Sequence, residues 1–577
     1  MRVKDPIQPD ADCLTEIFEA PTVSAGQHLR LEFPDLERFN GAWYCSFREA
    51  LSHYADATSK GRVLRSTDGK KWETVAVLSN PEPDGDIREP RLSITADGRL
   101  MAMSTLGYET PGAKLQEIDG EPRYADNAIW LSSDGQTWEG PFIAPELRNS
   151  YHFDQTWHDG WCYSVGYYWK DMLGTLYRSR DGKSWEVVAK HMFPERRGNE
   201  GTLAFGRDGT MHALLRGAGG GRIALGCAAP PFTDWKWREV DFLPCGERDR
   251  KALGQVVHSD FAGPNLIALR DGRLLAAAYF RQPVEPPPRI SVFLVHPGEA
   301  LLEEVVALEN LQSYPGLVEH DGSIFFTAAT VIDIFRIQFG SFPCPPEQGL
   351  PTLSDSDRNA RRRAQELAEC DDPARLEQAA VEDPDWRARL AAVERVSNPE
   401  VLTRALTADA AWSVRAAARP RLQGAVNFGE WFFRTDPDDE GQKLGWQRIM
   451  PGDRGWAVLP VPALWRDTRI GSAYLGVGWY LVDFTLPSDP ANQQLRLVFE
   501  GVDAQAWVYV NGEQAGEQSS AATGLPPDEL WDDPFAVVVS GAKLRYPDPN
   551  LLAVRVQAGP CNGGIYEAVI ASLEPAR

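Results

Sequence analysis

Short apolar runs broken by a polar residue and a glycine recur along the first part of the chain. RLSITADGRLMAMST and NLIALRDGRLLAAAYF are two examples. Such pairs occur six times, at Asn40-Gly41, Asp97-Gly98, Asp159-Gly160, Asp208-Gly209, Asp271-Gly272 and Asp321-Gly322. Both residues of such a pair tolerate the positive φ of a tight turn, and each pair lies between two strand-like runs. The pattern therefore predicts six β-hairpins.

The spacing of the six pairs indicates a repeat fold. Successive pairs begin 57, 62, 49, 63 and 50 residues apart. A four-stranded propeller blade needs about 50 to 60 residues. We therefore expect a mainly β protein whose first domain, residues 1–345, is a six-bladed β-propeller with its blades over roughly residues 20–342.

A second phrase, Ser-x-Asp-Gly-x-x-Trp, falls late in the first three repeats. Its copies are STDGKKWE, SSDGQTWE and SRDGKSWE, and PPFTDWKW stands at that place in the fourth repeat. Asp and Ser side chains can accept hydrogen bonds from turn amides, and Gly can take the left-handed conformation. We therefore expect turns between the outer two strands of a blade, with Asp68, Asp134 and Asp181 in structural roles.

The pattern becomes helical after residue 345. RNARRRAQELAECDDPARLEQAA is rich in the helix-forming residues Ala, Arg, Glu and Leu. Two related units follow, DWRARLAAVERV and AWSVRAAARPRL, with Trp386 and Trp412 at matching places. Residues 346–425 are therefore predicted to form either a pair of HEAT-like helical repeats or a helical linker.

Strand patterns return over residues 426–577. LRLVFEGVDAQAWVYVNGEQAGEQ alternates apolar and polar residues around an Asn511-Gly512 turn, which predicts a β-sandwich. The stretches YLGVGWYLVDFTLP, FEGVDAQAWVYVNG and GGIYEAVI resemble the jelly-roll sugar-binding domain of β-galactosidase- and β-glucuronidase-type glycosidases. The resemblance implies a domain that shapes an active site or binds sugar itself.

Composition excludes several classes of partner. The net charge is −23 without a basic patch, which argues against nucleic acid and anionic membranes, and the 19 Trp residues favour stacking on sugars. The eight cysteines form no Cys-x-x-Cys pair, so we expect no metal and no cofactor. The N-terminus MRVKDPIQPDADC has no apolar signal core, so we expect a cytoplasmic protein or one whose signal was removed.

Chemistry in a propeller is expected where the innermost strands begin, around the central channel. The repeats offer several arginines there, together with a glutamate, a tyrosine and histidines. This is more than a purely structural propeller needs. The candidates are Arg48, His53, Arg88, His152, Asp154, Glu200, Arg216, Arg281, Arg289 and Tyr314.

The three Ser-x-Asp-Gly-x-x-Trp phrases resemble the Asp boxes of the sialidase superfamily. NEGTLAFGRDGTMHALLR is similar to that family's strand with a catalytic Glu followed by an Arg, which gives Glu200 and Arg216. SYPGLVEHDG is similar to its Tyr phrase, which gives Tyr314. The resemblance implies a Tyr nucleophile activated by a carboxylate base, and a further arginine at Arg281 or Arg289.

Other positions depart from that family's pattern. The phrase EFPDL has Glu32 where the family has its first substrate-binding arginine. FREALSH has His53 near the place of the general acid, with Asp56 as a second candidate, and a His can serve as acid or base near neutral pH. Arg88 has no counterpart. The arginine clamp of sialidases is therefore expected to be absent or rebuilt.

Three functions follow from this pattern. The first is a glycosidase that cleaves a terminal bond in a sialic acid- or uronate-like glycan, with Tyr314, Glu200 and His53 catalytic and the remaining candidates binding substrate. The second is a lyase that acts on a uronate by β-elimination, with His53 or Tyr314 as the base. The third is a non-catalytic glycan-binding propeller. The substrate is an oligosaccharide or polysaccharide in each case, and the sugar, the linkage and the oligomeric state stay open.

Overall fold

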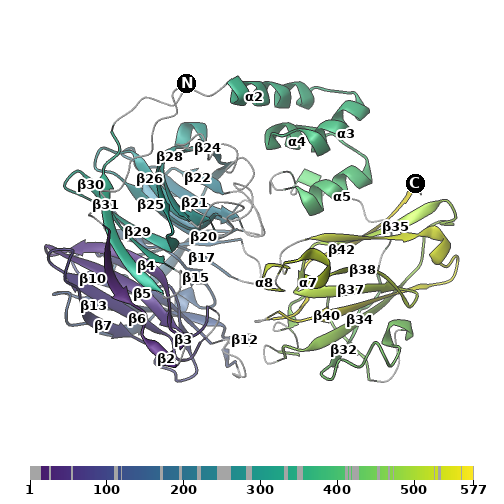
Figure 1. Ribbon diagram of the computed structural model, residues 1–577, viewed down its shortest axis with the longest axis horizontal. Coiled ribbons are helices and arrows are strands. Elements are labelled where there is room, and N and C mark those ends of the chain that lie inside the picture. The colour runs from purple at the N-terminus through teal and green to yellow at the C-terminus, as the bar shows by residue number, and fades with distance from the viewer. Residues whose placement is uncertain are drawn as a thin grey trace. The chain divides into compact units, whose positions relative to one another are not determined.

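The protein divides into two compact units, Met1–Thr352 and Leu353–Arg577, here called the N-terminal and the C-terminal unit. Figure 1 shows the first in purple to teal and the second in green to yellow. No described helix is long and apolar enough to cross a membrane. The computed structural model describes residues 14–24, 27–53, 56–108, 115–118, 120–168, 173–193, 198–217, 223–243, 261–280, 289–330, 335–346, 355–409, 414, 417–418, 421, 426, 428–450, 455–465, 468, 470–471, 474–525, 527–530, 534–559 and 562–575.

The described residues of the N-terminal unit form six sheets of four or five strands and two short two-stranded ribbons. The strands are antiparallel except for one parallel pair, β24 with β28. We number the sheets in chain order. Sheet 1 comprises β4 (Arg30–Phe39), β5 (Ala42–Ala50), β6 (Lys60–Ser66) and β7 (Glu73–Leu78); sheet 2 comprises β8 (Asp86–Ile87), β9 (Arg91–Ile94), β10 (Leu100–Gly107), β13 (Ala125–Ser132) and β14 (Glu139–Ile143); sheet 3 comprises β15 (Tyr151–His152), β16 (Thr156–His158), β17 (Trp161–Tyr167), β18 (Thr175–Ser179) and β19 (Trp185–Lys190). Sheet 4 comprises β20 (Gly198–Phe205), β21 (Met211–Gly217), β22 (Ala224–Ala228) and β23 (Lys236–Glu239); sheet 5 comprises β25 (Phe261–Ala268), β26 (Leu274–Phe280), β27 (Arg289–His296), β28 (Leu301–Glu309) and β24 (Asp241–Leu243); sheet 6 comprises β29 (Gln312–His320), β30 (Ser323–Thr330), β31 (Arg336–Pro343) and β1 (Thr15–Glu19).

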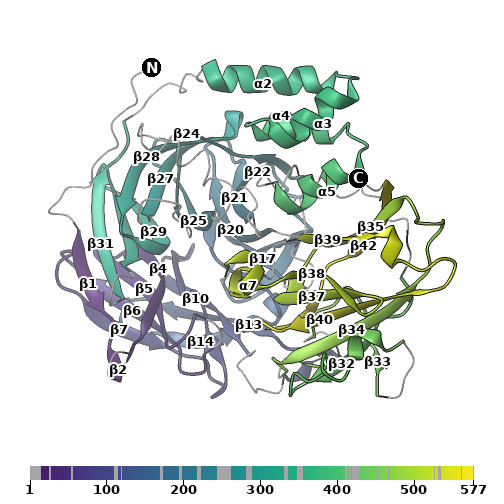
Figure 2. The same cartoon turned by 45° about the vertical axis from the view of Figure 1, so that its right-hand side comes forward.

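The sheets form a closed ring through their first strands. In sheet 2 the first strand is interrupted and comprises β8 and β9, which both pair with β10; in sheet 3 it comprises β15 and β16, which both pair with β17. β4 contacts β9, β9 contacts β16, β16 contacts β20, β20 contacts β25, β25 contacts β29, and β29 returns to β4. Figure 2 shows β4, β25 and β29 at the centre, with β1, β7 and β31 toward the edge. The outermost strand of sheet 6, β1, comes from the beginning of the chain and pairs with β31. The ring is therefore fastened by pairing the two ends of the unit.

All six predicted hairpins are present. Each joins the first strand of a sheet to the second, from β4–β5 in sheet 1 to β29–β30 in sheet 6. At Asn40-Gly41 the φ angles are +47° and +77°, and at Asp321-Gly322 they are +48° and +77°. In these two turns and at Asp159-Gly160 both residues have positive φ, which matches the twist of paired strands. At Asp97-Gly98, Asp208-Gly209 and Asp271-Gly272 only the glycine has positive φ.

The Ser-x-Asp-Gly-x-x-Trp phrases form the turns between the third and fourth strands of sheets 1 to 3, as predicted. In the third copy, Oδ1 of Asp181 accepts the N–H groups of Lys183 and Ser184 at 2.8 Å each. The indole of Trp185 donates to the carbonyl of Gly182 at 3.1 Å. The equivalent bonds recur around Asp68. These aspartates are therefore held by the turns themselves.

Four helices open the C-terminal unit, namely α2 (Asp355–Ala368), α3 (Pro373–Glu382), α4 (Trp386–Val393) and α5 (Pro399–Ala408). α4 packs against α2 and α3, and α3 also contacts α5. Asp372, Asp385 and Asn398 cap three of them by accepting backbone N–H groups, which satisfies donors that a helix end leaves unpaired. Most of AWSVRAAARPRL, the second predicted helical unit, lies outside the described residues.

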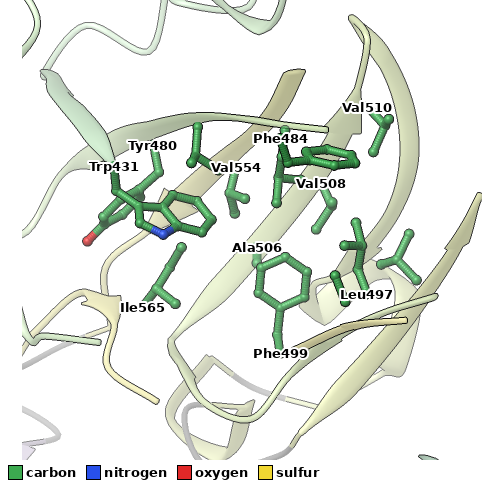
Figure 3. Packing of buried hydrophobic residues seen from close by; sticks show 14 of the residues in the cluster. Trp431, Tyr480, Phe484, Leu497, Phe499, Ala506, Val508, Val510, Val554 and Ile565 are labelled. Atoms are coloured by element: carbon green, nitrogen blue, oxygen red, sulfur yellow. The ribbon is translucent and has the colours of Figure 1, made fainter. Parts of the chain in front are cut away.

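Two sheets of the C-terminal unit face each other across one apolar core (Figure 3). Tyr480, Val508 and Val554 come from the larger sheet, and Leu497 and Phe499 come from the smaller; all five are fully buried. The larger sheet runs β33 (Ala457–Val458), β32 (Phe432–Asp436), β34 (Val477–Phe484), β40 (Asn550–Gln557), β37 (Gln505–Val510) and β38 (Glu513–Gln518); the smaller runs β39 (Phe535–Ser540), β35 (Gln493–Phe499) and β42 (Val569–Pro575); β36 (Val502–Asp503) pairs with β41 (Gly564–Ile565).

Candidate active site

The first strands of five sheets carry a residue with positive φ near their beginning. We call these five residues the inner bulges, because in four of the sheets the pairing register shifts at this point; in sheet 2 the residue lies between β8 and β9. Positive φ is uncommon for residues other than Gly. The inner bulges are Phe33 (+58°), Glu89 (+25°), Glu200 (+46°), Gly263 (+58°) and Ser313 (+71°).

Tyr314, Glu200 and Arg216, which the sequence offered as candidates, lie in hydrogen-bonding contact. The Tyr314 hydroxyl donates a hydrogen bond to Oε1 of Glu200, and Nη1 of Arg216 lies 2.5 Å from the same oxygen. The N–H of Gly263 donates to Oε2 of Glu200 at 2.9 Å. Tyr314 is 6% exposed and Glu200 4%, so this hydrogen-bonded group is almost entirely shielded from solvent.

The protonation of this group follows from its surroundings. Burial, followed by the charge of Glu200, raises the pKa of Tyr314 well above its ordinary value. The phenol therefore holds its proton at neutral pH, with a carboxylate oxygen already accepting it. A tyrosine becomes a nucleophile when a neighbouring base removes this proton, and Glu200 is the group bonded to it.

Aromatic rings fix the orientation of the Tyr314 ring. Phe33 meets it edge-on at 4.7 Å between centroids, and Phe153 stacks on it at 5.9 Å. A Cβ at Gly263 would come within 2.4 Å of the same ring. Glycine at this inner bulge is therefore needed both for its φ and for the approach of Tyr314.

Glu32 and His53 form a second hydrogen-bonded group, which the ring of Phe33 separates from Tyr314. Oε1 of Glu32 lies 2.9 Å from Nδ1 of His53, and the His53 ring lies 5.8 Å from Phe33, which contacts Tyr314. Burial alone would raise the pKa of Glu32, but the hydrogen bond from His53 and the charges of His53, Arg48 and Arg30 hold it well below its usual range. A carboxylate therefore fixes the orientation of the imidazole through Nδ1.

The guanidinium of Arg48 is bonded to the protein itself. It donates to Glu32 at 2.8 Å and to Asp86 at 2.9 Å, and also to the carbonyls of Ile87 and Ser52. Its side chain is 0% exposed. Arg48 was predicted to bind substrate, but these contacts assign it to holding Glu32 and Asp86 in place, so we leave it out of the proposed site.

His152 and Asp154 have protein partners as well. The two ring nitrogens of His152 lie 2.8 Å from the hydroxyls of Ser150 and Ser164, and burial lowers its pKa to about 3. Asp154 accepts the hydroxyl of Thr202 at 2.7 Å and joins sheet 3 to sheet 4. We leave both residues out of the proposed site, since the hydrogen bonds of each one join neighbouring strands or segments of the fold.

The remaining predicted arginines differ in their surroundings. Nη1 of Arg88 donates to the His53 carbonyl at 2.7 Å, and its side chain is 17% exposed. Arg289 pairs with the buried Glu304 at 3.0 Å, on the third strand of sheet 5. Arg281 lies outside the described residues. Arg88 and Arg216 are therefore the predicted arginines that stay in the proposed site.

Sequence reasoning did not select Glu89, although a signal for it exists. The inner strands repeat a phrase of one variable residue, then Pro or Gly, any residue and Leu. Its copies are FPDL, EPRL, EGTL, GPNL and YPGL, and they align Glu89 with Glu200 and Tyr314. Among the described residues, no group of three or more His, Cys, Asp or Glu side chains could hold a metal ion.

No family model matches the chain. Among curated proteins it is similar to the β-galactosidase BoGH2A of Bacteroides ovatus, with 30% identity over 129 residues, which is 19% of this chain and 13% of that protein. The chain therefore spans about an eighth of the length of this relative.

Three solved structures are also similar. A protein of unknown function from Dyadobacter fermentans is 17% identical with a TM-score of 0.46, over 58% of this chain and 99% of the other. The NanB sialidase of Streptococcus pneumoniae is 12% identical with a TM-score of 0.44, over 59% and 71%. The α-L-arabinanase of Penicillium chrysogenum is 12% identical with a TM-score of 0.41, over 57% and 98%.

Proposed function

We propose that the protein is a glycoside hydrolase that cleaves a terminal glycosidic bond with Tyr314 as its nucleophile. The observation that carries this proposal is the hydrogen bond from Tyr314 to Glu200, whose carboxylate also contacts Arg216. We further propose that the six sheets are the blades of a six-bladed propeller with this group at its axis. A tyrosine nucleophile is one of the exceptions to the usual pair of carboxylates in glycosidases.

The reaction begins with the transfer of the Tyr314 proton to Glu200. Arg216 balances the charge of Glu200 until Glu200 takes this proton. The phenol oxygen bonds to the anomeric carbon as the glycosidic bond breaks. The leaving oxygen needs a proton from a second group. The sequence predicted His53 for this step, and Glu89 is another candidate among the described groups near Tyr314.

For the substrate we propose a glycan that carries an anionic group, such as a sialic acid or a uronate. Arg88 and Arg216 support this, because both lie beside the candidate catalytic groups. The contacts of Arg48 with Glu32 and Asp86 favour a binding mode other than the arginine clamp of sialidases.

We propose three domains, namely the propeller over 1–345, a HEAT-like helical segment over 346–425 and a jelly-roll over 426–577 that binds carbohydrate. The helices pack in pairs, and the sheets of the last region share one core. These two observations support the division within the C-terminal unit.

A lyase acting by β-elimination is the second candidate. It is favoured by the pair of His53 and Glu32, since a carboxylate that holds a histidine through Nδ1 orients the ring and stabilises it when it takes a proton. A lyase makes an unsaturated uronide that absorbs in the ultraviolet, whereas a hydrolase does not.

Replacing Tyr314 by Phe tests the proposal after acidic oligosaccharides and aryl glycosides have been screened, with products identified by mass spectrometry. We expect kcat to fall by at least about a thousandfold, while product binding measured by calorimetry changes by a few-fold at most. Tyr163→Phe is the control, because it removes a hydroxyl from a ring that packs against Phe205 and Phe232.

Retained turnover in Tyr314→Phe would contradict the nucleophile assignment. Unsaturated products would identify a lyase instead. Binding of an acidic glycan without any product after long incubation would identify the non-catalytic propeller.

A further inference from the structure

Glu89 occupies in sheet 2 the inner-bulge position that Glu200 occupies in sheet 4. Its φ is +25°, against +46° for Glu200. The inner bulges Phe33 and Glu200 both contact Tyr314. Holding a glutamate at positive φ is costly, and two of the five inner bulges are glutamates. The fold therefore places a second glutamate at the strand position of Glu200, in another sheet of the same ring.

The carboxyl of Glu89 is buried without a full set of partners. The residue is 2% exposed, and its Oε2 accepts no hydrogen bond from any group in the described part of the chain. Its Oε1 lies 3.6 Å from Nε of Arg88, which is too long for a hydrogen bond. A buried carboxylate with an unbonded oxygen is unfavourable, so this site favours a protonated carboxyl.

The surroundings of Glu89 also favour its protonated form. Burial raises the pKa of Glu89 to about 7, and the charge of Asp86 adds to the rise, while Arg88, Arg48 and Arg91 oppose it. Burial also raises the pKa of Tyr167, and the charges of Glu200 and Glu89 add to that rise. Both carboxyls therefore lie within electrostatic range of the same tyrosine.

Glu89 and Glu200 are thus suited to opposite tasks. Both oxygens of Glu200 accept hydrogen bonds, from Tyr314, Arg216 and the N–H of Gly263. Glu89 lacks such donors on Oε2 and holds its proton. Two neighbouring carboxyls with such different environments commonly divide the roles of base and acid.

We propose that Glu89, and not His53, is the proton donor for the leaving group; this rests on the proposed function. The glycosidic bond breaks as its oxygen takes the Glu89 proton and Tyr314 bonds to the anomeric carbon. The Glu89 carboxylate then takes a proton from water, and the oxygen of that water bonds to the anomeric carbon. The C–O bond to Tyr314 breaks, and Tyr314 recovers its proton from Glu200. His53 contacts the substrate.

Leaving-group dependence tests this assignment. Glu89→Gln and His53→Gln are compared on two glycosides of the sugar that the unchanged protein cleaves, one with a nitrophenol and one with an alcohol as leaving group. We expect Glu89→Gln to lose about a hundredfold or more in kcat/KM on the alcohol glycoside and only a few-fold on the nitrophenyl glycoside, which needs no proton. We expect His53→Gln to lose kcat/KM equally on the two glycosides.

The pH profile gives a second reading. With Glu89 as the acid, kcat/KM of the unchanged protein on the alcohol glycoside falls as pH rises through about 7, and this fall is absent on the nitrophenyl glycoside, which needs no proton. A dependence on leaving group in His53→Gln, with none in Glu89→Gln, would overturn the assignment. Equal losses of kcat/KM on both glycosides in Glu89→Gln would also overturn the assignment.

Thermal unfolding tests the protonated carboxyl without any activity. The folded pKa of Glu89 is raised from 4.5 to about 7, so the folded state loses stability as pH rises across this window. The quantity to compare is the Tm of Glu89→Gln minus the Tm of the unchanged protein. We expect this difference to be more positive at pH 8 than at pH 4. A Tm difference that is more negative at pH 8 than at pH 4 would mean that Glu89 is an ionised partner of Arg88. This result would overturn the proposal even if no glycoside is cleaved. Absence of turnover alone contradicts the proposed function.

Discussion

Arg48 illustrates, at the scale of single residues, how charge in this protein is used to build the site. Its guanidinium bonds to Glu32 and Asp86, and Glu32 in turn holds His53. Removing one member of a buried ion pair leaves the other without compensation and costs about 3 to 5 kcal/mol. The arginine therefore supports the position of His53 through Glu32.

We expect Arg48→Gln to lower the free energy of unfolding of the N-terminal unit by about 3 to 5 kcal/mol, measured by urea unfolding with tryptophan fluorescence. Arg65→Gln is the control, because Arg65 pairs with the exposed Glu73 and such pairs are worth about 1 kcal/mol or less. A raised KM with unchanged stability would instead assign Arg48 to the substrate.

Sequence could predict the residues of the proposed nucleophilic group but not all their neighbours. Tyr314, Glu200 and Arg216 were selected by resemblance, and they lie in hydrogen-bonding contact. His152 looked equally suitable by residue type. Its two serine partners come from β17 and from the segment before β15. These contacts depend on how the strands pair, which cannot be predicted from the residue type alone.

At the scale of elements, the turns follow closely from local sequence. The six Asn-Gly or Asp-Gly hairpins and the three Ser-x-Asp-Gly-x-x-Trp turns lie where the pattern predicted. Their hydrogen bonds are made within a few residues, as in the bond of 2.9 Å from the N–H of Gly182 to the hydroxyl of Ser179. Local chemistry therefore suffices to specify them.

Ser179→Ala tests this structural role. The serine is 1% exposed, so its loss leaves the N–H of Gly182 without an acceptor and should cost about 1 to 2 kcal/mol of unfolding free energy, with kcat/KM unchanged. Ser184→Ala at the same turn removes an exposed hydroxyl 3.4 Å from Asp181 and should change stability by about 0.5 kcal/mol or less. A fall in kcat/KM for Ser179→Ala would place this turn in the site.

The inner bulges could not be predicted in the same way. Their hydrogen bonds join sheets that are distant in sequence: the N–H of Phe33 donates to the hydroxyl of Ser313 at 2.9 Å, and that of Gly263 donates to Glu200. The positive φ at these residues is therefore tied to neighbouring sheets. This is why Glu89 was passed over, although its phrase EPRL aligns with EGTL.

At the scale of the whole molecule, each unit has its own core and its own kind of sheet arrangement. The N-terminal unit closes its ring by pairing β1 with β31, which brings residues from distant repeats to one centre: Phe33 from sheet 1, Glu200 from sheet 4 and Tyr314 from sheet 6. The order of hairpins predicted this ring. The pairing of β24 with β28 in sheet 5 had no sequence signal.

The central claim is that Tyr314 bonds covalently to the sugar, and the mass of the full chain tests it most directly. A fluorinated glycosyl fluoride of the sugar that the protein cleaves slows hydrolysis of the intermediate more than its formation. We expect the chain to gain the mass of one glycosyl group, located on Tyr314 by peptide fragmentation and absent from Tyr314→Phe. An unlabelled chain under conditions of turnover, or a label on Glu200 or Glu89, would contradict the account.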